Sequence, residues 1–412
     1  MKTIIHLLHI ASRHHQNGDL SQAETVYRQI LETQPENADV FHLLGLISFQ
    51  RNCFTDAVSF ISRAVAIDPL ELAYLFSLGS IYSAVEKSDD AIKCYEKILE
   101  ICPDSVEAYF CMGSILEQQE EIDEAIAHYQ RASQINSGFL DAYIQEGRLL
   151  RVKGELEKAV EVYAVAGAIS PSSAEVCNGL GLVLVEQGKL EEASEAYKRA
   201  VSIKPGCAEI HNNLGFVLQK QNEWEDAAQH YNHAIFADPE YAEAYNNFGN
   251  LRQEQNQFKA AIECYRRAIS VDPDYAEAYS NLGAALQGDG DFSEAAEAHR
   301  CALKIGSNQA KLHFNYGVFC QYQGRLEEAI QAYKSAISLN RDFADAHKNL
   351  GMLLLLKGDF LNGWKEYEWR WNCDDFGEFW SKRNFPQPLL DDPDVQGKSI
   401  LILAEQGVGD QI

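Results

Sequence analysis

The sequence predicts an all-α protein built from antiparallel helix hairpins stacked one after another. Two ladders of small residues with a shared period of 34 residues predict this architecture. The glycine ladder consists of Gly45, Gly79, Gly113, Gly147, Gly181, Gly215, Gly249, Gly283, Gly317 and Gly351. The alanine ladder consists of Ala23, Ala57, Ala91, Ala125, Ala159, Ala193, Ala227, Ala261, Ala295 and Ala329, and Gly363 continues it. Because helices approach closely only where side chains are small, each period should contain one helix crossing.

The remaining positions of each period supply the two helices. Apolar residues at helical spacing mark the first helix, as at Tyr245, Phe248 and Leu251, and then the second, as at Phe258 and Tyr265. A short turn rich in glycine, asparagine or acidic residues joins the two helices. Proline then ends the second helix, since it cannot continue a helical hydrogen-bond pattern. These prolines are Pro35, Pro69, Pro103, Pro171, Pro205, Pro239 and Pro273.

This pattern resembles the tetratricopeptide repeat, which has a bulky residue, Leu-Gly, Ala, Tyr and Pro at these offsets. The resemblance covers residues 4–377. It implies a right-handed superhelical solenoid in which each hairpin buries its apolar face against its neighbours. We therefore expect eleven repeats in residues 1–377, an aromatic and proline-rich linker in 378–396, and a different domain from residue 397.

The composition of the chain indicates which classes of partner and which compartment to expect. The 35 basic and 61 acidic residues give a net charge of −26, which repels phosphate backbones and anionic lipids, so we expect neither nucleic acid nor membrane as a partner. The ten cysteines include no CxxC pair, which indicates free thiols in a reducing compartment. The first ten residues are too few and too polar to predict a signal peptide or a membrane span. The expected location is the cytoplasm.

A row of asparagines is the candidate binding site. It occupies the position two residues before the ladder glycine in five successive repeats, at Asn213, Asn247, Asn281, Asn315 and Asn349. A carboxamide can both donate to and accept from the backbone of an extended peptide, whatever the sequence of that peptide. The row also resembles the asparagine ladder of the protein O-linked N-acetylglucosamine transferases, which implies that it holds acceptor polypeptides. Asparagine at this position is also common in tetratricopeptide repeats generally, so a simple solvated role stays open.

Other polar groups receive structural interpretations. Acidic residues recur in the first turn of the first helix, where the helix dipole favours them. The histidines near the N-terminus, His6, His9, His14 and His15, have no cysteine or acid that would complete a coordination set. The sequence therefore predicts no metal site and no cofactor.

The C-terminal segment changes character. Residues 399–404 are a short apolar run, which predicts the first strand of an α/β domain, and the glycine-rich residues 405–410 predict a turn after it. The segment from Gly363 to Asp410 resembles bacterial repeat proteins that carry a glycosyltransferase-like domain after the repeats. The turn is also similar to that of the heptosyltransferase family, which implies that Asp410 would act as a base in a complete parent protein.

Two functional hypotheses follow. The first is a protein-protein interaction scaffold that binds extended polypeptide in the concave groove. The alternative is the acceptor-recognition arm of a protein glycosyltransferase whose catalytic domain lies beyond residue 412, so that a nucleotide sugar would bind only to the complete parent protein. The chain as given should have no catalytic activity of its own.

Overall fold

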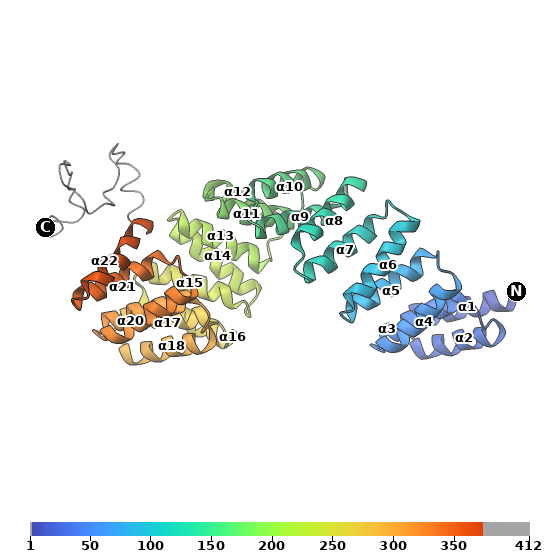
Figure 1. The fold of residues 1–412 in the computed structure, drawn as a ribbon. Coiled ribbons are helices and arrows are strands. Elements are labelled where there is room, and N and C mark those ends of the chain that lie inside the picture. Colours follow the sequence, from blue (N-terminus) through green and yellow to red (C-terminus); the bar gives the residue numbers. More distant parts are fainter. Residues whose placement is uncertain (1, 374–412) are drawn as a thin grey trace, which may run out of the picture. The chain divides into compact units, whose positions relative to one another are not determined.

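The computed structural model describes residues 2–373 of the 412-residue chain (Figure 1). Within this range all regular structure is helical, and no strand occurs. The all-α prediction is therefore confirmed for the described residues. The strand expected at 399–404, the linker at 378–396 and the turn that contains Asp410 lie outside them.

The helices follow the 34-residue period. In the first of two compact units, Met1–Leu251, they are α1 (Lys2–Gln16), α2 (Leu20–Thr33), α3 (Ala38–Gln50), α4 (Phe54–Ile67), α5 (Leu72–Ala84), α6 (Ser88–Ile101), α7 (Val106–Gln118), α8 (Ile122–Ile135), α9 (Leu140–Val152), α10 (Leu156–Ile169), α11 (Ala174–Glu186), α12 (Leu190–Ile203), α13 (Ala208–Lys220) and α14 (Trp224–Ala237). Helix α15 (Ala242–Glu254) contains the boundary. The second unit, Arg252–Ile412, has α16 (Phe258–Val271), α17 (Ala276–Asp289), α18 (Phe292–Ile305), α19 (Ala310–Tyr322), α20 (Leu326–Leu339), α21 (Ala344–Leu356), α22 (Phe360–Tyr367) and a 3₁₀ turn (Glu368–Asn372).

The two small-residue ladders have a direct structural cause. A Cβ atom on Gly181 would lie 2.5 Å from the ring of Tyr197, and one on Gly317 would lie 2.6 Å from the ring of Tyr333. The same second-helix position packs against the ladder glycine in the other repeats for which the contact is described. The ladder alanines from Ala23 to Ala329 are completely buried. The glycines therefore allow the close approach that the sequence predicted, and in most repeats they make room for a buried aromatic ring, whereas Gly45 faces Ile61 and Gly351 faces the backbone of Tyr367.

In four repeats the buried tyrosine also joins the two helices of its hairpin by a hydrogen bond to the side chain twelve positions earlier. Tyr231 donates to Gln219 Oε1 at 2.8 Å, and Tyr333 donates to Gln321 Oε1 at 2.6 Å. Each glutamine is twelve residues earlier, near the end of the first helix. The hydroxyl group is thus satisfied inside the core, where an unpaired polar group would cost about 1–3 kcal/mol.

Each turn between the two helices of a hairpin contains one residue with positive φ. This residue is Gly or Asn in nine repeats, and it is Glu86 in the third repeat and Glu120 in the fourth. The left-handed region is sterically accessible to glycine and tolerated by asparagine, which explains the composition of the turns.

Successive hairpins within a unit pack mainly through the second helix of one hairpin and the first helix of the next, as α8 packs on α9 and α16 on α17. Successive first helices also touch: α11 contacts α9 and α13 in the first unit, and α17 contacts α19 in the second. Among the described residues, no two successive second helices contact to that extent. The first helices therefore form the more tightly packed side of each unit, which is the side that carries the asparagine row.

Candidate functional site

The predicted asparagine row lies on the first helices of five repeats. Asn213 (α13) and Asn247 (α15) belong to the first unit, and Asn281 (α17), Asn315 (α19) and Asn349 (α21) belong to the second. All five side chains are half-buried. They are neither enclosed in the core nor fully exposed, so a ligand could reach them.

In the first unit each asparagine of the row is bonded to the preceding repeat. Asn213 Nδ2 donates to Asn178 Oδ1 at 3.0 Å, and Asn247 Nδ2 donates to Asn212 Oδ1 at 3.0 Å. Each acceptor lies 35 residues earlier, one position before the row. The bonds fix the orientation of the row side chains and also connect neighbouring hairpins.

The accepting asparagines continue the network to an acidic residue. Asn178 Nδ2 donates to Glu209 Oε1 at 2.9 Å, and Asn212 Nδ2 donates to Glu243 Oε1 at 3.1 Å. Glu209 and Glu243 belong to the first-turn acids for which the sequence favoured a role at the helix dipole. The structure adds a second role, because each carboxylate anchors the asparagine that orients the next member of the row.

The second unit uses different partners for the same purpose. Asn315 Nδ2 donates to Ser280 Oγ at 3.0 Å, again 35 residues earlier, and Asn349 Nδ2 lies 3.4 Å from the hydroxyl of Tyr333. Asn281 also has a partner within the chain. The row is therefore held in place in both units.

Four of the held asparagines keep hydrogen-bonding capacity for a ligand. In residues 2–373 no donor reaches Oδ1 of Asn213, Asn247, Asn315 or Asn349. A carboxamide has two N–H groups and one oxygen acceptor, so one N–H and the oxygen remain after the bond to the neighbouring repeat. This pair of groups matches one peptide unit of an extended chain.

The basic residues beside the row are paired with acids. Lys311 Nζ lies 3.2 Å from Glu277 Oε1, and Lys348 Nζ lies 2.7 Å from Asp345 Oδ1. These lysines are partly neutralised where they stand. The arrangement favours recognition of a peptide backbone over capture of a terminal carboxylate by a cluster of basic side chains.

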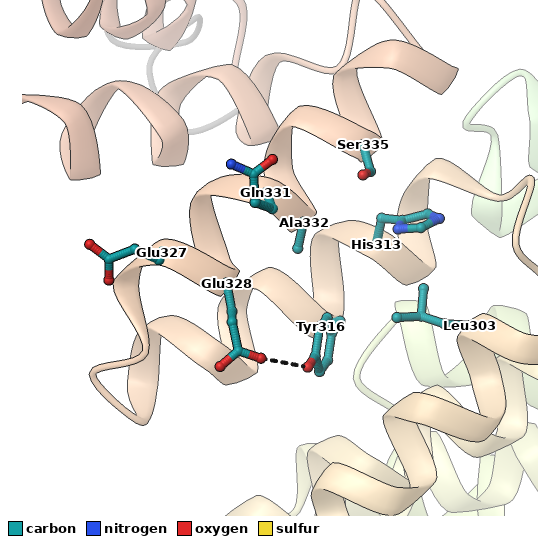
Figure 2. Close-up of a pocket in the computed structure, with 8 residues that line it drawn as sticks. All are labelled: Leu303, His313, Tyr316, Glu327, Glu328, Gln331, Ala332 and Ser335. Carbon is teal, nitrogen blue, oxygen red and sulfur yellow. Dashed lines mark hydrogen bonds between the residues drawn. The ribbon is translucent and has the colours of Figure 1, made fainter.

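A shallow pocket lies away from the asparagine row, on α18, α19 and α20 (Figure 2). Tyr316 donates to Glu328 Oε2 at 3.3 Å at one end of this pocket, and Arg325 pairs with the same carboxylate. His313 and Leu303 line the other end. Both carboxylates of the pocket are already paired, since Glu327 lies 3.0 Å from Lys357 Nζ. The asparagine row, whose groups recur in five repeats, remains the stronger candidate.

The remaining sequence predictions have different outcomes. Asp410 lies outside the described residues. At the N-terminus, His14 Nδ1 is 3.5 Å from Asp19 and His15 Nε2 is 3.1 Å from Gln50. The N-terminal histidines do not form a group of three ligands, but His211, His230 and His233 do. This second group was not among the sites predicted from the sequence.

No helix in residues 2–373 combines the length and the apolar character that crossing a membrane requires. All ten cysteines are free thiols.

Comparison with protein families identifies the repeat. Residues 105–313, which are 209 of the 412 residues, match the family described as the cilia and flagella-associated protein 70 C-terminal domain. Residues 10–71, 72–105 and 320–358 match models of the tetratricopeptide repeat. Curated protein sequences include no match.

Several solved structures are similar over part of the chain. MamA is 28% identical over 42% of this chain and 94% of its own, with a TM-score of 0.36. YrrB, whose structure is described as a tetratricopeptide repeat protein with an unusual peptide-binding site, is 23% identical over 45% of this chain and 95% of its own, with a TM-score of 0.38. PilF of Pseudomonas aeruginosa is 21% identical over 49% of this chain and 92% of its own, with a TM-score of 0.43.

Proposed function

The chain belongs to the tetratricopeptide repeat family, and from this membership we propose that it binds extended polypeptide along the first helices of its repeats. A protein-protein interaction scaffold is the function that the repeats support. The proposal adds the location of the ligand and the groups that hold it.

The observation that carries this proposal is the remaining hydrogen-bonding capacity of the asparagine row. In Asn213, Asn247, Asn315 and Asn349 one N–H bonds to the preceding repeat, while the carboxamide oxygen has no donor within the described residues. A side chain that is already fixed loses little conformational entropy when it binds a ligand. Within each unit the row would thus read the backbone of a peptide with little regard to its sequence.

A matched pair of substitutions in the second unit tests the proposal. Asn315→Ala removes both the ligand-binding groups and the bond to Ser280, whereas Ser280→Ala removes only that bond. With a peptide selected from a displayed random library on the wild-type chain, we expect Asn315→Ala to weaken binding by about 0.5–1.5 kcal/mol, and Ser280→Ala to weaken it less.

Anisotropy titrations of the labelled peptide measure both changes, and circular dichroism monitors the fold. Replacing Asn247, Asn281 and Asn315 together should weaken binding by about 1–4 kcal/mol. Equal losses in Asn315→Ala and Ser280→Ala would assign the row a structural role in repeat packing. Unchanged affinity in the triple variant would assign it a solvated role.

We also propose a more specific alternative, in which the repeats are the acceptor-recognition arm of a protein glycosyltransferase. The sequence motif at 397–410 supports it, and so does an exposed apolar surface on the last hairpin. Leu356 is 71% exposed, Leu361 is 86% exposed and Trp364 is 55% exposed. A following domain would remove this apolar area from water.

A nucleotide-sugar transfer assay on a chain extended past residue 412, with and without Asp410→Asn, tests this alternative. The substitution keeps the shape of the side chain but removes its basic carboxylate.

The cytoplasm remains the proposed location. The ten free cysteines support a reducing compartment, since a thiol-rich protein would otherwise be exposed to oxidation. Labelling of accessible thiols in intact cells tests this proposal, with the exposed Cys53 as the reporter.

A further inference from the structure

Three histidines converge at the packing surface between helices α13 and α14 of the first unit. His211 lies on α13, and His230 and His233 lie three residues apart on α14. One ring nitrogen from each histidine can be chosen so that all three lie within 4.8 Å of one another. The rings of His211 and His230 are 5.2 Å apart at their centroids, and those of His211 and His233 are also 5.2 Å apart.

The bond on the far side of His211 fixes its tautomer. His211 Nε2 lies 2.9 Å from the carbonyl oxygen of Pro205, which can only accept, so Nε2 carries the hydrogen. The lone pair of neutral His211 is therefore on Nδ1, where it accepts a hydrogen bond from His230 Nδ1–H at 2.9 Å. A metal ion would replace this hydrogen when His230 carries its hydrogen on Nε2 instead. Donation of the second ring N–H to a backbone carbonyl is the usual arrangement of a histidine that binds a metal.

The separation of the two facing nitrogens is that of a hydrogen bond, a little shorter than the separation in a zinc site. Zinc–nitrogen bonds of about 2.0–2.1 Å place two nitrogens of a tetrahedral ion about 3.3–3.4 Å apart. The observed 2.9 Å between His211 Nδ1 and His230 Nδ1 needs only a small side-chain rotation to reach this distance. His233 is exposed, so its ring can turn towards the same point.

The surroundings of His211 and His230 favour the neutral form of these two imidazoles. Burial, followed by the neighbouring His211 and His233, lowers the pKa of His230 to about 4, and burial also lowers the pKa of His211. The other charged groups that face His230 are Asp226 on its own helix and Lys198 on α12, which act in opposite directions. Neutral imidazole is the form that binds zinc.

Histidines at the His211 position of two other repeats show which part of the arrangement is structural. His313 Nε2 lies 3.0 Å from the carbonyl of Ser307, and His347 Nε2 lies 2.9 Å from that of Arg341. These histidines stand three and four repeats after His211 and make the same backbone bond. The bond alone is therefore a local packing device of the repeat.

The two partner positions distinguish the seventh repeat. His230 and His233 are replaced by Ala332 and Ser335 in the tenth repeat, and by Glu366 and Trp369 in the eleventh. In the second repeat His230 and His233 are replaced by Phe60 and Arg63. The Arg63 guanidinium lies 4.4 Å from the centre of the Phe41 ring, which stands at the His211 position. Among the described residues, three histidines meet only in the seventh repeat.

We propose that His211, His230 and His233 form a binding site for Zn²⁺. Imidazole ligands suit zinc and the neighbouring first-row ions, and three protein nitrogens leave at least one coordination position for water or for a side chain of a bound protein. No cysteine or carboxylate belongs to the cluster, and the exposure of His233 leaves the site accessible to solvent.

Calorimetric titration of the full chain with zinc chloride at neutral pH tests the proposal, after prior treatment with a chelator. We expect one site that is lost in the His230→Gln/His233→Gln variant, with at least about a 10-fold fall in affinity for His233→Gln alone. Because His233 is exposed, its substitution should leave the helical circular dichroism unchanged. Cobalt(II) should give the visible absorption of a four-coordinate site in the wild type and lose it in the double variant.

Two control variants make the result specific. His313→Gln removes the same backbone bond in a repeat without histidine partners, and should leave zinc binding unchanged. His14→Gln/His15→Gln removes the other adjacent histidines and should also have no effect. Absence of zinc binding in the wild type, or equal affinity in the wild type and in His230→Gln/His233→Gln, would overturn the proposal.

Discussion

Single residues in this solenoid deviate from the repeat pattern at a cost that can be measured. His299 occupies the position at which most repeats have a buried tyrosine, and it lies against Gly283 with only 3% of its surface exposed. Burial lowers the pKa of His299 to about 4. The imidazole is therefore neutral in the folded protein at pH 7, and it gains a proton more readily in the unfolded chain, where its pKa is about 6.5.

This difference predicts a loss of stability in mild acid. Between pH 6.5 and 4 the unfolded state binds the proton and the folded state does not, so stability falls as the pH is lowered through this window, by on the order of 3 kcal/mol in total. His299→Tyr should remove this contribution, and the new hydroxyl could bond Gln287, which lies twelve residues earlier as in the other repeats. Urea unfolding at pH 7 and pH 4 measures the change. Tyr333→His is the converse variant and should add acid sensitivity, whereas an unchanged pH slope in both variants would contradict the prediction.

The glutamates in two turns are a second deviation. Glu86 and Glu120 have φ values of +59° and +64°, where a side chain with a Cβ atom costs about 1–2 kcal/mol. Glycine avoids this cost but loses more entropy on folding, so we expect Glu120→Gly to stabilise the chain by about 0.5–1 kcal/mol. The urea midpoint should rise with an unchanged slope. Asn222→Gly should have a smaller effect because asparagine already tolerates this conformation, and a lower midpoint for Glu120→Gly would contradict the argument.

At the scale of the element, the helix hairpin depends on close approach at one point. Gly181 packs against Tyr197, whose side chain is 1% exposed and cannot move towards solvent. Because each repeat contacts only its neighbours, damage at this crossing should remain within adjacent hairpins.

Gly181→Ala tests this element directly. The added Cβ would lie 2.5 Å from the tyrosine ring, so we expect a loss of about 1–3 kcal/mol. Hydrogen exchange should increase mainly in α11, α12 and the helices beside them. Gly206→Ala is the control, since no atom lies within 4 Å of its added Cβ. A uniform rise in exchange along the whole first unit would contradict the nearest-neighbour account.

Sequence and structure agree best at this scale, because a periodic pattern repeats the same contact many times. The crossing of Gly181 and Tyr197 could be predicted since every repeat except the second, which has Ile61, combines small and aromatic residues at these positions. The bond from Asn213 to Asn178 could not be predicted, because the two residues are 35 apart and therefore occupy different positions in the 34-residue repeat. The His211, His230 and His233 cluster was missed for a similar reason. The sequence signal for the cluster is that three repeat positions all hold histidine in the same repeat. This signal appears only when the repeats are aligned and their helix faces are compared.

At the scale of the whole molecule, net charge acts on every partner. The chain has 61 acidic and 35 basic residues, and first-turn acids recur on the helices that carry the asparagine row. The hydrogen-bond donors to Glu209 and Glu243 are uncharged: asparagines donate to both carboxylates, and Tyr241 also donates to Glu243. A peptide that approaches this surface therefore meets a negative potential.

The final prediction separates this potential from the asparagine row. Peptides selected on the wild-type chain should be enriched in lysine and arginine, and their association rate should fall as added salt shortens the Debye length from about 30 Å at 0.01 M to about 8 Å at 0.15 M. The dissociation rate depends on short-range bonds, so it should change little with salt and should rise in Asn315→Ala. Surface plasmon resonance at several salt concentrations measures both rates, and a charge-neutral variant of the selected peptide is the control. Selection of acidic peptides, or an association rate that does not depend on salt, would show that the negative surface serves solubility alone, while the effect of Asn315→Ala on dissociation would still test the row by itself.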